Sequence, residues 1–552
     1  IPSPVHFNGS GDIPGGGLYT IFSSFMLANS DFYSGCFPAE YYNAIGGIFD
    51  VKLRSGNPWK HEFSTQVGVL GLELSAEGPL AHANGPTFIC NVRLSTMQLL
   101  NKIITELSPR QTVGYQDYSA KLYFPDTKIG RISIWGILGR SKVNQDAANA
   151  PDEWLSNDDR SDLSMGNLMF ASGITNEYTI GNRISMRNIV AVTGDCRHMN
   201  YGIRPQDRPD VPASDYEYDD KSTNLIVSST LNQRLSNRTI GRYGLSYKHI
   251  RDNCLMQFGS DAESSFCDYS GTAQLIQGHG QIKHDISAKI TSILGGCVTY
   301  FSSSRECTVE PRLGLEYKPK RNQSVAVGAG LHSQTAPLYI YMMDTSKPDE
   351  NNHTLKMLKS FHLNGSYSLT VSPVCRLKIE PYFQYLYDVP VLENSTFSLI
   401  NLTTMPSQFK EHDRFVGNGA GLNTGIDITY ERFLSKGYYY MGTMSIFSSE
   451  YRDYFKDWHP TIFDARWYFN ILGGKEFTFR RKNGLNKVLG LNAHVSLSGH
   501  NPYSPVDYEE SHRNQTIVYD ESLPFSYRKK GINILCDISL TYIVNYRPFT
   551  GT

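Results

Sequence analysis

The residue types that carry chemistry are present in this sequence, but their spacing does not match a catalytic site. The 552 residues contain no Gly-x-Ser-x-Gly nucleophile motif and no Walker-type phosphate loop. The Gly-rich run 417–421 precedes a predicted strand, whereas a phosphate-binding loop precedes a helix. His279 and His284 are not at metal-ligand spacing, and the acidic pairs Asp158-Asp159 and Asp219-Asp220 fall in or near predicted loops, with a calcium site there as the lesser alternative. We therefore predict no enzyme activity, no cofactor and no metal.

The nine cysteines also lack the spacing of a metal site, because no Cys-x-x-Cys or Cys/His ligand pattern occurs. Cys254 and Cys267 fall together in a predicted polar loop. They are the best disulfide candidates if the compartment is oxidising. Cys536 lies on the apolar register of its strand and is expected to act as a small hydrophobe.

The elements that must position these residues are strands of unusual length. In 309–318 the odd positions are apolar and the even positions are mostly charged, and similar alternation recurs along the chain after about residue 60. Alternation over more than about eight residues exceeds the usual soluble strand and fits a tilted membrane strand. The sequence contains no run of about 18 apolar residues, so it predicts no transmembrane helix. The formal net charge of -1 gives no basic footprint for nucleic acid.

The connections between the predicted strands alternate between short and long. We expect about twenty strands. Short links include 125–129, 179–182, 235–238, 319–322, 372–374 and 433–437, and long ones include 141–162, 199–214, 251–270, 334–356, 390–413 and 499–528. Outer-membrane barrels sort their links in this way, with short periplasmic turns and long extracellular loops. The pattern therefore predicts an all-β fold, a transmembrane antiparallel β-barrel.

One stretch, 33–57, differs from the long strands that follow it. The motifs Phe37-Pro38-Ala39-Glu40-Tyr41 and 46–57 resemble the last segment of the plug domain of TonB-dependent outer-membrane receptors, of the type common in Bacteroidetes. Tyr42 departs from the family, which usually has glycine there. Strand motifs such as 310–315, 378–382 and 473–477 resemble the barrel of the same family.

The resemblance implies a barrel of about 22 strands around a plug. It assigns residues 1–57 to the C-terminal part of the plug and 58–552 to the barrel, and it implies that a final hairpin is missing. It also implies import of an unidentified solute across the outer membrane, with outer-membrane lipid, the TonB complex (through a segment not in this sequence) and possible surface lipoproteins or other outer-membrane subunits as partners. The alternative is a structural barrel in a larger outer-membrane complex.

Two groups of residues are candidates for function in such a barrel. Lys52 and Arg54 are two apart on a strand and share a face, so we expect them to latch the plug to inward carboxylates such as Glu380 or Asp427. The alternative is that this charged face lies against water in the lumen. Aromatic and charged side chains of the long loops and lumen are candidate ligand contacts: Trp154, Arg204, Tyr216, Tyr218, His332 and Arg414.

Overall fold

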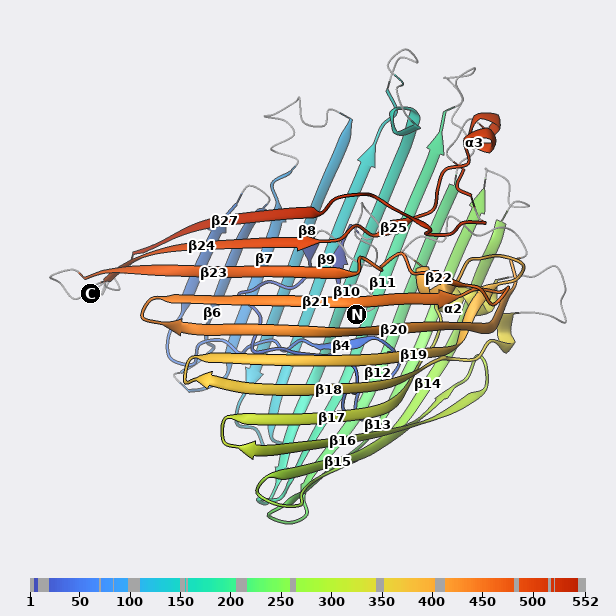
Figure 1. Cartoon of the computed structure of the whole chain (residues 1–552). Coiled ribbons are helices and arrows are strands. Elements are labelled where there is room, and N and C mark those ends of the chain that lie inside the picture. The colour runs from blue at the N-terminus through green and yellow to red at the C-terminus, as the bar shows by residue number, and fades with distance from the viewer. Residues whose placement is uncertain are drawn as a thin grey trace.

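The computed structural model describes residues 4–7, 19–68, 71–82, 84–97, 110–148, 154, 157–204, 216–258, 265–343, 352–402, 413–480, 486–514, 518–520 and 522–544. Its regular structure is almost entirely strand, with two short helices, α2 (Leu338–Met342) and α3 (Tyr508–Asn514), and a few 3-10 turns (Figure 1). Among these residues no helix has the length and apolar character needed to cross a membrane.

One antiparallel sheet dominates the molecule and, in the described part of the chain, holds 21 strands. This confirms the predicted all-β antiparallel barrel. In chain order its strands are β5 (Glu62–Val67), β6 (Gly71–Pro79), β7 (Thr87–Ser95), β8 (Gln111–Phe124), β9 (Arg131–Gln145), β10 (Ser161–Ile180), β11 (Ile184–Ile203), β12 (Tyr216–Arg234), β13 (Thr239–Phe258), β14 (Ser265–Asp285), β15 (Ile290–Phe301), β16 (Glu306–Lys320), β17 (Gln323–Gln334), β18 (Leu358–Ser372), β19 (Cys375–Leu392), β20 (Phe415–Ser435), β21 (Tyr438–Arg452), β22 (Trp458–Pro460), β23 (Trp467–Arg480), β24 (Asn486–Ser498) and β27 (Asn533–Val544).

The two faces of the sheet carry opposite kinds of side chain, as β16 illustrates. Leu313 and Leu315 are 54% and 44% exposed on the outer face, whereas Glu310 and Arg312 are 2% and 5% exposed on the inner face. A soluble protein buries its leucines and exposes its charges. The reversed pattern is that of a barrel whose outer face meets lipid.

The links alternate in length as the sequence predicted. Turns of a few residues join β10 to β11, β12 to β13 and β20 to β21, and they gather at one end of the barrel, which we call the short-turn rim (Figure 1, lower left). The other ends of these strands lie at the opposite end of the barrel with α2 and α3, and we call this end the long-loop end. Strands β13 and β14 run further into this end than predicted, because they continue to Phe258 and from Ser265.

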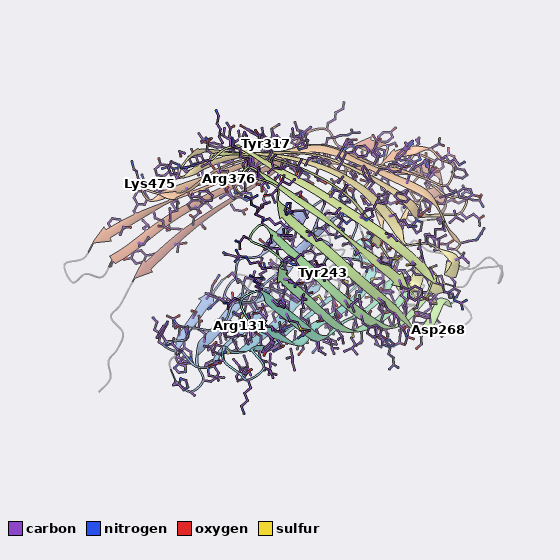
Figure 2. The ribbon with its side chains drawn as sticks, turned by 90° about the horizontal axis from the view of Figure 1, so that it is seen from below. Arg131, Tyr243, Asp268, Tyr317, Arg376 and Lys475 are labelled. Atoms are coloured by element: carbon purple, nitrogen blue, oxygen red, sulfur yellow. The ribbon has the colours of Figure 1, made fainter. Side chains whose placement is uncertain are left out.

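The barrel has one weak seam. The strand order passes from β27 to β5, yet no register pair is recorded between these two strands in the described residues, whereas the neighbouring pair β24 and β27 is in register over its full length. Residues 533–542 of β27 are exposed on both faces. In Figure 2 the strand that carries Lys475 and the strand that carries Arg131 lie on the two sides of this seam.

Residues 4–7 and 19–57, here called the inner segment, join no strand of the large sheet within the described residues. Their four short strands pair only with one another: β1 (Val5–His6) with β2 (Tyr19–Thr20), and β3 (Asp31–Ser34) with β4 (Gly47–Asp50). Side chains on the inner face of wall strands from β6 to β19 contact this segment. It therefore lies within the curve of the wall, where β4 is seen behind the orange strands in Figure 1.

Candidate functional site

Arg312 on β16 makes several contacts with one turn of the inner segment. Its Nη1 donates to three carbonyl oxygens of one turn, those of Phe37 (3.1 Å), Pro38 (2.5 Å) and Tyr41 (2.9 Å). The turn presents these carbonyls together because the Tyr41 amide donates to the Pro38 carbonyl oxygen. The guanidinium also stacks on the Phe37 ring, with 4.8 Å from Cζ to the ring centroid. A flat, multiply donating guanidinium suits this arrangement, and a lysine does not.

Glu310 holds Arg312 in place from the same strand. Its Oε2 accepts from Arg312 Nη2 at 2.9 Å, and its Oε1 accepts from the hydroxyls of Thr299, Thr308 and Ser333. Both charged side chains are almost fully buried. A buried pair of this kind is stable only when its remaining donors and acceptors are satisfied, as those of Glu310 are here.

A second fixed contact with the wall is made by Arg54. Its Nη1 and Nη2 donate to the two carboxylate oxygens of Glu77 on β6, each at 2.6 Å, and its Nε donates to the Phe25 carbonyl oxygen at 2.5 Å. The Asn57 amide also donates to Glu77, at 2.8 Å. Arg54 therefore ties the inner segment to the wall at the point where the chain leaves the lumen.

Lys52 makes a different and weaker contact. Its Nζ lies 2.7 Å from Asp31 and 3.3 Å from Asp50, both within the inner segment, and its side chain is 44% exposed. Exposed ion pairs of this kind contribute about 0–1 kcal/mol. Lys52 thus joins β3 to β4 and does not reach the wall.

The structure does not bring Lys52 or Arg54 to the carboxylates proposed for them. Glu380 pairs with Lys378 on its own strand at 2.7 Å, and it lies opposite Asp427 in register. Both carboxylates line a cavity of about 490 Å³ between the wall and the turn that holds Phe37. The partner of Arg54 is Glu77, because the chain enters the barrel beside β6. Strand parity could not predict this, since it carries no information on position around the wall.

Further polar contacts fix the rest of the inner segment. They come from strands around much of the wall, which distributes the attachment over many weak contacts. They are Ser23 to Glu73, Arg93 to the Thr20 carbonyl oxygen, His6 to Asp117, Arg242 to Glu40, Tyr42 to Ser246, and Gln384 to the Ile45 carbonyl oxygen.

His332, a candidate ligand contact, belongs to the same boundary. Its ring packs between Phe37 and His362, with centroid distances of 4.0 and 4.5 Å, and it is 1% exposed. The His332 side chain faces the inner segment. Its contacts there are packing contacts of a buried ring. No pattern in the sequence predicted this contact with Phe37.

The other candidate ligand contacts are engaged by the protein itself. Tyr216 and Tyr218 are 3% and 2% exposed in an apolar cluster beneath α2, with Tyr339 and Tyr341. Arg204 pairs with Asp162, Arg414 pairs with Glu393, and Trp154 Nε1 donates to the Ala148 carbonyl oxygen. The structure does not gather the six residues into one site.

Below this apolar cluster lies a group of buried charges. Arg197 Nε is 3.1 Å from Asp195 and its Nη2 is 2.7 Å from Asp220. Asp252 joins them on β13, so three carboxylates face one guanidinium, and the three are 0–4% exposed. The group lies beyond the lipid-facing band, because the outward residues above Leu225 are polar. Burial raises the pKa of Asp195 to about 6.

Asp252 is the carboxylate of this group that lies close to a second carboxylate, that of Asp220. Burial, and then the negative charge of Asp220, raise the pKa of Asp252 above its usual range. One atom of each of the two carboxylates has no hydrogen-bond partner. At neutral pH the protein therefore holds more buried negative charge here than Arg197 neutralises.

Cys254 and Cys267 lie at the same level. They are on the neighbouring strands β13 and β14, not in a loop, and both are buried and free. In register Cys254 faces Tyr269 and Cys267 faces Met256, so the two cysteines are diagonal neighbours. A hydrogen bond to Cys267 and burial raise the pKa of the Cys254 thiol, which keeps it protonated and slow to react. Their pairing stays a prediction.

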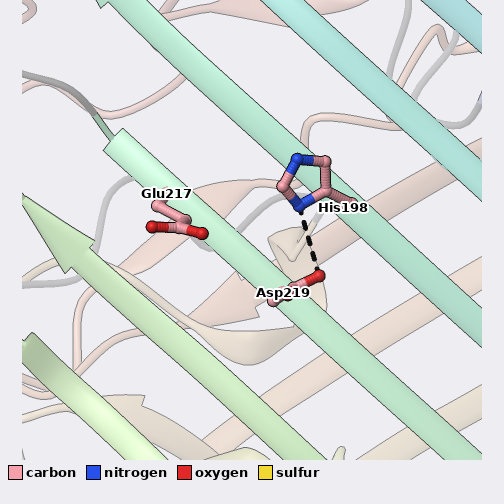
Figure 3. Close-up of side chains that lie close together, drawn as sticks. All are labelled: His198, Glu217 and Asp219. Carbon is pink, nitrogen blue, oxygen red and sulfur yellow. Dashed lines mark hydrogen bonds and ion pairs between the residues drawn. The ribbon is translucent and has the colours of Figure 1, made fainter.

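A third cluster lies on the outer face of β11 and β12 (Figure 3). His198 Nδ1 is 3.2 Å from Asp219, and the ligand atoms of His198, Asp219 and Glu217 all lie within 4.8 Å of one another. An imidazole and two carboxylates could hold a divalent metal ion. Lys221 already lies 3.4 Å from Asp219, and Gln257 donates to Glu217, so we assign no metal to this cluster.

Comparisons with known proteins find structural relatives only. No family model and no curated protein matches the sequence. The ferric yersiniabactin uptake receptor FyuA from Yersinia pestis superposes with a TM-score of 0.65 and 12% identity over 93% of this chain and 77% of that one. The siderophore receptor PirA from Acinetobacter baumannii gives 0.61 and 12% over 94% and 78%. The FrpB iron transporter from Neisseria meningitidis gives 0.60 and 12% over 87% and 84%. The chain therefore shares the fold of these receptors.

Proposed function

We propose that this protein is an outer-membrane transporter that imports a solute into the periplasm by moving its inner segment. In this proposal residues 1–57 are the end of a plug and 58–552 form the barrel. The short-turn rim faces the periplasm and the long-loop end faces the medium. The fold shared with uptake receptors supports the proposal.

The observation that carries the proposal is the kind of contact that holds the inner segment. Arg312, Glu77 and other wall residues hold it through hydrogen bonds and ion pairs. Polar groups released from such contacts are solvated by water, so the net free energy of each contact is only about 0.5–3 kcal/mol. A segment held in this way can be released stepwise by external work without unfolding the barrel.

The source of that work is the second part of the proposal. The resemblance of 37–57 to a TonB-dependent plug, and within that family to the Bacteroidetes type, supports coupling to a TonB complex. A surface lipoprotein at the long-loop end is a further proposed partner. The solute itself is unidentified, and ferric siderophores are the first class to test because two of the relatives are named as receptors for them.

Uptake measurements in cells test this function. The gene is deleted in the native host, and growth is compared on media that supply iron only as ferric siderophores or carbon only as glycans. Uptake of the radiolabelled solute is then measured with and without a protonophore. We expect a gene-dependent uptake that the protonophore abolishes. Gene-dependent uptake that resists the protonophore would indicate a passive pore and contradict the proposal.

The alternative, a structural barrel within a larger complex, has one observation in its favour. Tyr503, Tyr508, Tyr519 and Tyr527, in the loop between β24 and β27, are 47–82% exposed. Exposed aromatic side chains are typical of protein–protein contacts. This alternative predicts that a partner is lost from the purified complex when these tyrosines are changed, with no change in uptake.

A further inference from the structure

The outer face of the wall near the short-turn rim carries a row in which cations and aromatic rings alternate. Arg432 on β20 lies over the ring of Tyr438 on β21, with 4.2 Å from Cζ to the centroid. Tyr438 is opposite Lys475 on β23 in register. The Lys475 Nζ is in turn 5.2 Å from the centroid of Phe477. The three strands thus form one continuous strip.

The row continues across the next two strands towards the seam. Lys487 on β24 is opposite Phe479 in register, and its Nζ lies 5.4 Å from the centroid of Tyr542 on β27. Tyr430 and Tyr440 add two further rings beside Arg432, with their centroids 6.0 Å apart.

The register shows that this row faces outward. Arg432 is opposite Tyr440, and the exposed fractions of Tyr438 and Tyr440 are both 38%. The chain neighbour of Arg432, Glu431, points to the inner face, where it pairs with Arg376 at 2.6 Å. Arg432 and Arg376 are therefore two arginines at the same height on opposite faces of the wall.

The cations of the row lack anionic partners. Within the described residues no carboxylate lies within ion-pairing distance of Arg432, Lys475 or Lys487. Arg432 Nη1 donates to Cys375 Sγ at 3.9 Å, and its buried Nε has no hydrogen-bond partner. A cation next to a membrane is stable only near an anion or water. The neighbouring turns add to the positive charge, since six of the eight turns at this rim between β6 and β21 carry a basic residue and Asp126 is their one acid: Lys128, Arg183, Arg238, Lys289, Arg321 and Lys436.

We propose that this row binds the phosphate headgroups of anionic phospholipids in the periplasmic leaflet of the outer membrane, with Arg432 and Lys475 as the principal contacts. The rings lie at the height where aromatic belts meet the headgroups, and the cations supply the charge that a phosphodiester needs. A free phosphate would use the cations but not the rings, so the lipid is the better match. The inference depends on the proposed outer-membrane location and not on transport.

The test measures stabilisation of the purified full-length protein in detergent by added lipid. Phosphatidylglycerol should raise the unfolding temperature, because a ligand that binds the folded state stabilises it. Arg432→Ala and Lys475→Ala should each weaken the apparent affinity about fivefold. Arg432→Lys should retain most of it, and Arg376→Ala, which removes the same charge from the opposite face, should leave it unchanged.

Three results would overturn the inference. The first is an equal rise of the unfolding temperature with phosphatidylethanolamine, which would show that the protein does not distinguish the headgroup charge. The second is an equal shift with inorganic phosphate, and the third is an equal loss in Arg376→Ala. If Arg432→Ala does not assemble, the test compares the apparent phosphatidylglycerol affinity of Lys475→Ala with that of Arg376→Ala. Uptake is measured separately, so failure of this test leaves the transport proposal standing.

Discussion

Arg312 of the wall and Phe37 of the inner segment meet in two ways at once. The guanidinium donates to the Phe37 carbonyl oxygen at 3.1 Å while its Cζ lies over the Phe37 ring, 4.8 Å from the centroid. The same nitrogen reaches two more carbonyls of the turn, so one side chain of the barrel contacts three residues of the inner segment. The contact joins positions 275 residues apart.

Removal of Arg312 should release this turn. In Arg312→Ala the carbonyls and Glu310 are left buried without their donor, and breaking a buried ion pair costs about 3–5 kcal/mol. We expect a lower thermal midpoint and, in planar bilayers, ion leakage through an assembled barrel. Arg312→Lys keeps the charge but not the planar set of N–H donors, so its thermal midpoint and ion leakage should lie between those of the wild type and Arg312→Ala. An Arg312→Ala protein as stable and as tight as the wild type would refute the role of this contact.

Lys52 and Arg54 should differ although they lie two residues apart. Arg54→Ala removes the paired hydrogen bonds to Glu77 and should raise leakage, whereas Lys52→Ala removes an exposed pair within the inner segment and should change stability by about 1 kcal/mol or less. The double variant Lys52→Glu/Arg54→Glu should therefore behave as Arg54→Glu alone. Equal effects of the two single variants on bilayer conductance would contradict this assignment.

The alternating pattern of β16 was sufficient to predict which side chains face lipid, because a strand places successive residues on opposite faces. The short turns were predictable for a similar reason. The partner of Arg54 was not, since parity fixes a face but neither the height nor the position around a barrel. The burial of Tyr216 and Tyr218 also escaped prediction, because it depends on α2, which folds back from a loop far along the chain.

The buried charges near Arg197 predict a pH dependence. The pKa of Asp195, about 6 when folded, is raised from an unfolded value of about 3.9, so the folded state gains most below pH 4 and loses stability as the pH rises through 6. Asp252 shifts in the same direction. These two carboxyls therefore contribute more to the free energy of unfolding at pH 5 than at pH 8. Relative to the wild type, Asp252→Asn should raise the thermal midpoint more at pH 8 than at pH 5, while the outward-facing Asp219→Asn should show no such difference. A gain in Asp252→Asn that is no larger at pH 8 than at pH 5 would contradict the sign.

The diagonal placement of Cys254 and Cys267 predicts that an oxidant links them. After copper–phenanthroline treatment, non-reducing mass mapping should recover a peptide that joins the two, and the exposed Cys536 should remain free. Reaction should be slow because both thiols are buried beneath α2. Recovery of Cys254 and Cys267 as separately alkylated peptides after full oxidation would rule the pair out.

The most direct test of the account asks whether the inner segment must move. A Cβ at Gly328 on β17 would lie 3.2 Å from the Cβ of Cys36 and 3.6 Å from its Sγ, close to disulfide geometry. In Gly328→Cys, oxidation should therefore tether the inner segment to the wall, and Gly328→Ser serves as the matched control. Under conditions where growth depends on this gene, oxidised Gly328→Cys cells should grow like the deletion strain and recover when a reductant is added. Normal growth of cells in which mass mapping confirms the cross-link would show that the segment need not move, and would contradict transport by release of the inner segment.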